Sequence, residues 1–150
     1  MERVLSARDR GAPVTRPLVY VAGSSGELER ARRAMAYLRA AGLEVAHDWV
    51  AEVERVGVAN PADATRAQRS GWAVSCLLGL TDASAVWLLA PEVETRGAWL
   101  EIGYALDRSL DGRGPPIVSS GRTSQSIFLA LTQEVATDEQ ALAVLRGWLL

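Results

Sequence analysis

Short apolar runs alternate with segments of helical periodicity along the chain from residue 17 onward. Each apolar run predicts a strand, and each stretch in which apolar residues recur every three or four positions predicts a helix. Strands that alternate with helices form a parallel sheet with right-handed crossovers. We therefore expect a single-domain α/β fold, flavodoxin-like (Rossmann-like), with strand order 2-1-3-4-5 and helices on both faces. The predicted strands are residues 18–22, 43–47, 84–90, 116–119 and 134–136, and the predicted helices are residues 24–42, 65–80, 95–108, 124–131 and 137–148.

Length and composition restrict the class of protein. A chain of 150 residues suffices for one hydrophobic core, which we assign to residues 17–150. Residues 1–16 lack the apolar run of a signal peptide, so we expect a flexible arm and a cytoplasmic protein. A hydrophobic fraction of 49% and a net charge of -2 argue against a membrane span and against nucleic-acid binding. The single cysteine, Cys76, excludes an internal disulfide, and we predict neither a metal nor a cofactor.

Polar and small residues follow four of the predicted strands. In an open parallel sheet the ligand lies beyond the carboxyl ends of the strands, so these segments are expected to meet at one edge. Residues 48–64, after the second strand, are predicted to be a long loop, and long loops in compact domains are often functional. The segments that we expect at the ligand are Gly23-Ser24-Ser25-Gly26, His47-Asp48-Trp49, Pro91-Glu92 and Ser119-Ser120-Gly121-Arg122.

The loop from Gly23 to Gly26 leads from the first strand into a helix. Ser24 and Glu27 have the spacing of a capping box, and backbone N–H groups at such a helix start attract anions. The loop lacks the lysine of a P-loop and the third glycine of a dinucleotide fingerprint. A single phosphate or a sugar hydroxyl is therefore the expected ligand, and a tight turn without a ligand is an equally good interpretation.

Glu101 is the candidate catalytic residue of the chain. On the predicted helix its neighbours three and four positions away are Gly97, Ala98 and Ala105, which leave room for a substrate beside the carboxylate. Most glutamates on helices are simply solvated. The helix around Glu101 is nearly apolar on all sides, and an acid in such a helix beside the strand ends is a candidate for catalysis.

Three stretches of the sequence carry a resemblance to a known family, namely Val19-Tyr20-Val21-Ala22-Gly23-Ser24, Ala83-Ser84-Ala85-Val86-Trp87-Leu88-Leu89 and Gly97-Ala98-Trp99-Leu100-Glu101-Ile102-Gly103-Tyr104-Ala105-Leu106. Together they resemble the nucleoside 2-deoxyribosyltransferase superfamily, which includes the 2′-deoxynucleoside 5′-phosphate N-hydrolases. The resemblance extends over residues 17–150, and its most specific part is a small-x-x-Glu-x-Gly-Tyr-Ala pattern. It implies that Glu101 is a nucleophile that attacks the anomeric carbon and forms a covalent glycosyl-enzyme. Tyr104 would hold the carboxylate in position, or would be an ordinary core aromatic.

The sequence departs from this family at one position. Family members carry an aspartate eight residues before the Asp that opens the third strand, where it assists the leaving base. Counting back from Asp82 gives Val74, so that acid is missing. We expect Asp48 to supply the proton instead, with His47 as an alternative proton donor or as a structural residue.

The resemblance also implies a homodimer or larger homo-oligomer with shared active sites. In the N-hydrolases a serine after the fourth strand reaches the substrate phosphate of a neighbouring subunit, and Ser124 and Ser126 are equal candidates for it here. Ser120 and Arg122 belong to the same segment, and Arg122 would add positive charge. Three tryptophans offer faces for stacking on a base or are core residues, namely Trp49, Trp72 and Trp99.

The sequence thus predicts an N-glycosidase that acts on a small-molecule nucleotide or nucleoside, preferably a (deoxy)nucleoside 5′-monophosphate. Three other interpretations remain. The first is a true deoxyribosyltransferase, in which a second base replaces water. The second is an NAD-cleaving enzyme, because Trp99-Leu100-Glu101 resembles the aromatic-x-Glu region of TIR domains. The third is a nucleotide-sensing module without turnover.

Overall fold

The computed structural model describes residues 16–58 and 60–150, so the arm predicted for residues 1–16 lies outside the described part except for Arg16. The strands are β1 (Leu18–Ala22), β2 (Glu44–Val45), β3 (Ala85–Leu89), β4 (Ile117–Ser120) and β5 (Gln133–Val135). The α-helices are α1 (Leu28–Ala40), α2 (Trp49–Val56), α3 (Arg66–Asp82), α4 (Gly97–Leu110) and α5 (Asp138–Leu149). Short 3₁₀ segments, η1 to η4, span Ser25–Glu27, Pro61–Asp63, Thr123–Gln125 and Ile127–Leu131.

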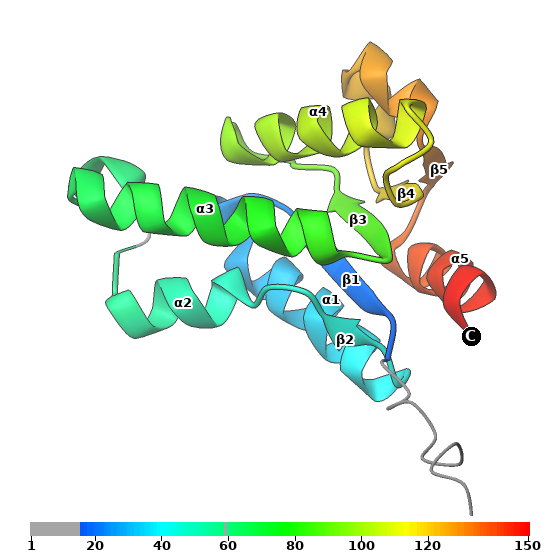
Figure 1. Cartoon of the computed structure of the whole chain (residues 1–150), viewed down its shortest axis with the longest axis horizontal. Coiled ribbons are helices and arrows are strands. Elements are labelled where there is room, and N and C mark those ends of the chain that lie inside the picture. Colours follow the sequence, from blue (N-terminus) through cyan, green and yellow to red (C-terminus); the bar gives the residue numbers. More distant parts are fainter. Residues whose placement is uncertain (1–15, 59) are drawn as a thin grey trace, which may run out of the picture.

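The five strands form one sheet in the order β2-β1-β3-β4-β5 (Figure 1). Every neighbouring pair is parallel, with Val19 opposite Ala85 and Val86 opposite Ile117 in the central register. The predicted flavodoxin-like order 2-1-3-4-5 is therefore confirmed. The carboxyl ends of all five strands lie at the same edge of the sheet, where the sequence predicts the ligand.

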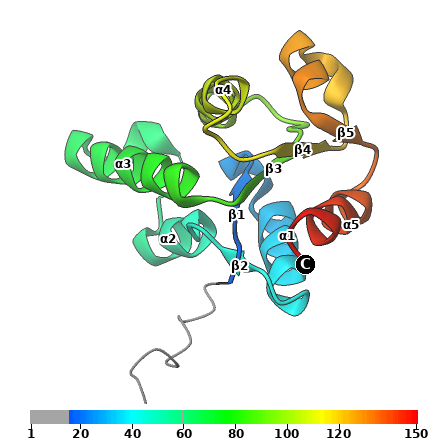
Figure 2. The same cartoon turned by 45° about the vertical axis from the view of Figure 1, so that its right-hand side comes forward.

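Helices cover both faces of the sheet, as predicted, with α1 and α5 on one side and α3 and α4 on the other (Figure 2). Side chains along a strand alternate between the two faces. Val19 and Val21 of β1 pack into the core beneath α1 and α5, whereas Tyr20 and Ala22 pack into the core beneath α3 and α4. This alternation directs the Tyr20 side chain toward the helix that carries Glu101.

Part of the segment predicted to be a loop is helical. The prediction for residues 48–64 is wrong for Trp49–Val56, which form α2. Asp48 caps this helix, because its Oδ1 accepts a hydrogen bond from the Ala51 backbone N–H at 2.9 Å. Trp49 and Val50 are buried against the core, and Gly57 ends the helix in the left-handed conformation with φ 72°. A cap, an apolar face and a terminal glycine thus mark a short helix.

The helix caps also refine the predictions. Thr65 and Thr137 form complete capping boxes at the starts of α3 and α5. Ser24 accepts a hydrogen bond from the Gly26 backbone N–H at 3.1 Å and begins η1, but the expected capping box with Glu27 does not form. The Glu27 carboxylate instead accepts the backbone N–H of Glu92. The short helix predicted for residues 124–131 consists of two 3₁₀ segments.

In the described part of the chain, none of the helices combines the length and the apolar character that crossing a membrane requires.

Candidate active site

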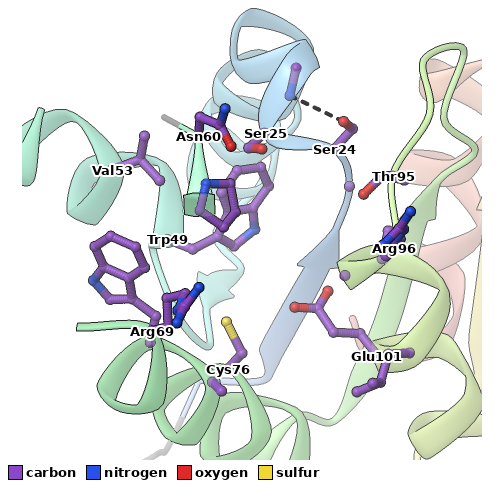
Figure 3. A pocket seen from close by; sticks show the side chains of 18 of the residues that line it. Ser24, Ser25, Trp49, Val53, Asn60, Arg69, Cys76, Thr95, Arg96 and Glu101 are labelled. Carbon is purple, nitrogen blue, oxygen red and sulfur yellow. Dashed lines mark hydrogen bonds between the residues drawn. The ribbon is translucent and has the colours of Figure 1, made fainter. Parts of the chain in front are cut away.

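A cavity of about 1020 Å³ opens where β1 and β3 end (Figure 3). Its walls come from the segments after those two strands, from α2 and η2, and from the facing sides of α3 and α4. A volume of this size suits a small molecule of the size of a nucleotide. The lining residues are Gly23–Gly26, Trp49, Glu52, Val53, Asn60, Pro61, Arg69, Trp72, Ala73, Cys76, Leu77, Glu94–Ala98, Leu100 and Glu101.

Glu101 lies in the wall of this cavity, and two polar side chains contact it. The Tyr20 hydroxyl of β1 donates a hydrogen bond to Oε1 of Glu101 at 2.9 Å. The Cys76 thiol of α3 contacts both the Tyr20 hydroxyl and the Glu101 carboxyl. In Figure 3 the thiol and the carboxyl face the same hollow from opposite helices. Three segments far apart in the sequence therefore position one carboxylate.

The surroundings of Glu101 set its protonation near neutral pH. Burial raises the pKa of the Glu101 carboxyl to about 7, although the Tyr20 hydroxyl and the Cys76 thiol lower it by favouring the charged form. Burial, together with the charge of Glu101, raises the pKa of the Cys76 thiol to about 12 and also raises the pKa of the Tyr20 hydroxyl. Both neighbours therefore keep their protons when Glu101 ionises. Such a carboxyl is suited to nucleophilic or acid–base chemistry.

Two of the three small residues predicted beside Glu101 line the cavity. Gly97 and Ala98 belong to the lining, whereas Ala105 is buried in the core beneath α4. A Cβ added to Gly97 would meet no other atom within 4 Å. Access to Glu101 along the start of α4 is therefore open, as the sequence predicts.

The loop Gly23–Gly26 forms the polar end of the cavity. All four residues belong to the lining. Ser24 is only 4% exposed and its hydroxyl caps η1, whereas Ser25 is half-buried and faces the cavity. Thr95 and Arg96, which precede α4, line the cavity opposite this loop. Hydroxyls and a guanidinium therefore meet at this end, which suits an anionic group.

Another part of the cavity wall is mainly apolar, and it borders this loop, because a Cβ added to Gly23 would lie 3.7 Å from the Trp49 ring. Trp49 is 9% exposed, and its indole N–H donates to the Val21 backbone carbonyl at 2.8 Å, which fixes the ring. Trp72 of α3 and Val53 of α2 line the same region. The sequence indicates Trp49 and Trp72 as stacking faces, and the structure brings them together, whereas Trp99 lies outside this cavity. A flat aromatic ligand fits such a region.

Several polar lining residues were not predicted. They are Glu52 on α2, Asn60, Arg69 on α3, and Glu94, Thr95 and Arg96. Glu52 and Asn60 follow the second strand, in the segment that the sequence predicts to be a loop. The helical spacing of Trp49, Glu52 and Val53 is the signal in the sequence that identifies Glu52. Tyr20 belongs to the predicted strand 18–22 and Cys76 to the predicted helix 65–80, and only the packing of α3 on β1 shows their contact with Glu101.

Asp48 and His47 lie outside the cavity lining. The Asp48 carboxylate caps α2 and forms an ion pair with Arg39. Burial opposes the charge of Asp48, but the Ala51 N–H and the Arg39 guanidinium outweigh it and hold the pKa of Asp48 below its usual value. A carboxyl of lowered pKa is a poor proton donor at neutral pH. The predicted role of Asp48 in protonating the leaving base gains no support from this position.

Tyr104 does not contact Glu101, which corrects the prediction that it holds the carboxylate. Its hydroxyl lies 3.0 Å from the Thr81 hydroxyl of α3. The guanidinium of Arg108 lies over its ring at 5.7 Å. The reason is that Tyr104 lies almost one turn beyond Glu101 and faces the last turn of α3. Tyr20 occupies the position that we assigned to Tyr104.

The predicted substrate-binding residues near β4 lie apart from the cavity of their own chain. Pro91 is buried and its carbonyl accepts from the Gln125 side chain. The Ser120 hydroxyl donates to Asp138 at 2.7 Å and accepts from the Trp87 indole. Arg122 and Ser124 are exposed, and Ser126 caps η4 beside a second cavity of about 430 Å³. These side chains therefore do not line the site of their own chain.

Among residues 16–58 and 60–150, no group of three or more His, Cys, Asp or Glu side chains is placed to hold a metal ion.

Comparison with known proteins identifies a shared fold. No protein-family model matches the chain, and no curated protein matches it. Among solved structures, the chain is similar to the Clostridium botulinum CMP N-glycosidase BcmB, with a TM-score of 0.50 and 14% sequence identity. The match covers 88% of this chain and 99% of that one. At this identity the similarity shows a common fold over nearly the whole of both chains.

Proposed function

We propose that the protein is a nucleotide N-glycosidase that cleaves the N-glycosidic bond of a (deoxy)nucleoside 5′-monophosphate. The observation that carries the proposal is the Glu101 carboxyl, which lies in a nucleotide-sized cavity with a pKa raised to about 7. The polar residues in the wall of that cavity match the phosphate, and the tryptophans match the base. The fold shared with a CMP N-glycosidase supports the same class of reaction.

The proposed reaction is a double displacement at the anomeric carbon. The ionised Glu101 oxygen attacks C1′ while the C1′–N bond breaks, and the base leaves with the bonding electrons and takes up a proton. A water molecule then attacks C1′ of the glycosyl ester, loses a proton and releases the sugar phosphate. Glu101 is regenerated as a carboxylate, and the sugar configuration is retained.

Tyr20 and Cys76 are positioning residues in this scheme. Both keep their protons at neutral pH and hold the carboxyl at the wall of the cavity. Their contacts favour the ionised form, which is the nucleophile, and oppose the effect of burial. Their role is to keep a half-buried carboxylate reactive near neutral pH.

The phosphate is assigned to the end of the cavity lined by Ser25, Thr95 and Arg96. Charge-assisted hydrogen bonds from hydroxyls and a guanidinium bind a phosphate far more strongly than a 5′-hydroxyl. The matching nucleoside should therefore be a poorer substrate than its monophosphate. The base is assigned to the part of the wall that contains Trp49 and Trp72.

We further propose a homodimer or larger oligomer in which subunits share sites. Apolar side chains around the second cavity are unusually exposed, with Leu110 at 71%, Ile127 at 84% and Phe128 at 60%. Ser124 and Ser126 lie in the same region but outside the cavity of their own chain. A second copy packed on this face would cover the apolar side chains and bring these serines toward its neighbour's site. A fully active monomer at high dilution in sedimentation would contradict the proposal.

The direct test is a panel of nucleosides, monophosphates and NAD, followed by chromatography of the free base. Release from monophosphates supports the hydrolase, and exchange into an added second base supports a transferase. Release of nicotinamide supports the TIR-like interpretation, and binding without product supports a sensor. Glu101→Gln keeps the size of the side chain but removes the nucleophile, so it should abolish base release. Wild-type rates in this variant would contradict the proposal.

A further inference from the structure

Under the proposed function, C1′ of the nucleotide lies at Glu101 and the base lies against the indoles of Trp49 and Trp72. Indoles bind the faces of a base and do not distinguish one base from another, because every base has a π-face. Selection among bases requires a polar group in the plane of the ring, at the edge of the base.

Glu52 is a charged group in the cavity wall that these tryptophans also line. It lies on α2, one turn after Trp49. Its side chain is 23% exposed, so it is neither buried in the core nor free in solvent. An ionised carboxylate only accepts hydrogen bonds.

His47 lies beside the Glu52 carboxylate. His47 Nε2 lies 3.2 Å from Oε2 of Glu52, and the two groups attract each other when the imidazole is protonated. The contact does not have the geometry of a hydrogen bond, and among the described residues Nε2 has no hydrogen-bond partner. His47 is itself fixed, because a Cβ added to Gly79 of α3 would lie 2.7 Å from the His47 Cβ. His47 is the contact of Oε2 of Glu52, and none of the described residues donates a hydrogen bond to Oε1.

The other polar groups in this part of the cavity wall are hydrogen-bond donors. The Asn60 side-chain oxygen accepts from the Ala62 N–H at 3.0 Å, which leaves its amino group to donate. Arg69 also only donates, and both residues are exposed. They suit carbonyl oxygens of a ligand at the rim. Glu52 is the charged acceptor on the base side, whereas Glu94 belongs to the segment before α4.

We propose that Glu52 reads the base and selects nucleotides whose base carries an exocyclic amino group. This inference rests on the proposed function of the cavity. The amino groups of cytosine and adenine donate at the base edge, whereas uracil and hypoxanthine present a carbonyl oxygen at the same position. A carboxylate accepts from the first and repels the second. A site built to bond a substrate N–H rejects the analogue that lacks it much more strongly than an apolar site does.

The test compares two matched pairs of ligands, CMP with UMP and AMP with IMP. Within each pair the ring size is the same and the amino group is replaced by a carbonyl. In the wild type, kcat/KM should favour the amino base by about tenfold or more in at least one pair. Glu52→Gln offers both a donor and an acceptor, so the preference in that pair should fall at least about fivefold.

Two further variants make the result specific. Glu54→Gln changes a neighbouring glutamate of α2 that pairs with Arg32 outside the cavity, and it should keep the wild-type preference. Glu52→Asp keeps the charge but shortens the side chain, and it should weaken the preference even if Glu52→Gln does not fold. Equal kcat/KM within both pairs in the wild type, or an unchanged preference in the Glu52 variants, would overturn the inference.

Dissociation constants of the same four nucleotides, measured by calorimetry on Glu101→Gln, separate this inference from the proposed function. If CMP and AMP bind to Glu101→Gln more tightly than UMP and IMP, and the added substitution Glu52→Gln removes the difference, Glu52 reads the base even where no base is released. If base is released from both members of each pair at equal rates, the N-glycosidase proposal stands and the reading by Glu52 is wrong. Absence of binding by all four nucleotides would overturn it as well.

Discussion

Replacing Tyr20 by phenylalanine removes one hydroxyl from the wall of the cavity and should change the pH dependence of the reaction. The Tyr20 ring is 0% exposed, and phenylalanine keeps its packing beneath α3 and α4. The lost hydroxyl donates to the Glu101 carboxylate at 2.9 Å. The substitution therefore acts mainly on the charged form of Glu101.

The expected magnitude follows from this one contact. A hydrogen bond to a charged group is worth roughly 1.5–3 kcal/mol, and each pKa unit corresponds to about 1.36 kcal/mol. The pKa of Glu101, about 7 in the wild type, should therefore rise by roughly 1–2 units in Tyr20→Phe. The nucleophile must be ionised, so activity rises as the pH rises through this pKa. At pH 7 the ionised fraction, and with it the rate, should fall by roughly 5–50-fold and recover at higher pH.

The assay is kcat/KM for base release from a nucleoside monophosphate between pH 5 and about 9.5. The acid limb of the profile should move to higher pH in Tyr20→Phe. Tyr104→Phe is the matched control, because it removes a hydroxyl that contacts Thr81 and not Glu101. An acid limb at the same pH in wild type and Tyr20→Phe, or an equal shift in Tyr104→Phe, would refute the reasoning.

Three other substitutions test separate parts of the structure. Glu101 has a folded-state pKa of about 7 against an ordinary 4.5, so the stability present below pH 4.5 is lost as the pH rises toward 7. The free energy of unfolding of Glu101→Gln should thus exceed that of the wild type by up to about 3 kcal/mol at pH 8 and by little near pH 4. Equal Tm values of the two proteins at pH 8 would contradict the buried charge. Ser25→Asp places a carboxylate beside the proposed phosphate site, where it repels a phosphate. In the wild type, kcat/KM for the monophosphate should exceed that for its nucleoside by at least about tenfold, and in Ser25→Asp this preference should be reversed. Gly79→Ala brings a Cβ within 2.7 Å of the His47 Cβ and 3.1 Å of the Tyr20 ring. The free energy of unfolding, measured by chemical denaturation, should therefore fall by about 1–3 kcal/mol. The control Gly71→Ala meets no atom within 4 Å on the same helix and should not destabilise, and an equal loss in both variants would refute the close packing at Gly79.

The sheet order and the position of Glu101 could be predicted because both depend on patterns within short segments. Alternation of apolar runs and helical periodicity determines a parallel α/β sheet, and the small residues Gly97 and Ala98 beside an acid are visible in the sequence. The edge of the sheet where ligands bind follows from the fold class. These steps require no knowledge of which helices touch.

The neighbours of Glu101 could not be predicted in the same way. Tyr20 is 81 residues from Glu101 in the sequence, and their contact depends on how α3 and α4 pack on β1. Tyr104 was the more obvious candidate because it is close in sequence, but the helix directs it toward Thr81. The position of Glu52 in the cavity wall is hidden for a different reason, since the sequence predicts a loop where α2 forms and gives no register for its cavity-facing side.

The account depends most on a covalent bond between Glu101 and the sugar. Rapid acid quenching of the enzyme with a nucleoside monophosphate, followed by mass spectrometry of the digested protein, measures this bond directly. We expect the peptide that contains Glu101 to gain the mass of the sugar phosphate less one water during turnover, and we expect no adduct in Glu101→Gln. Base release without an adduct on Glu101, or an adduct on another residue, would contradict the account.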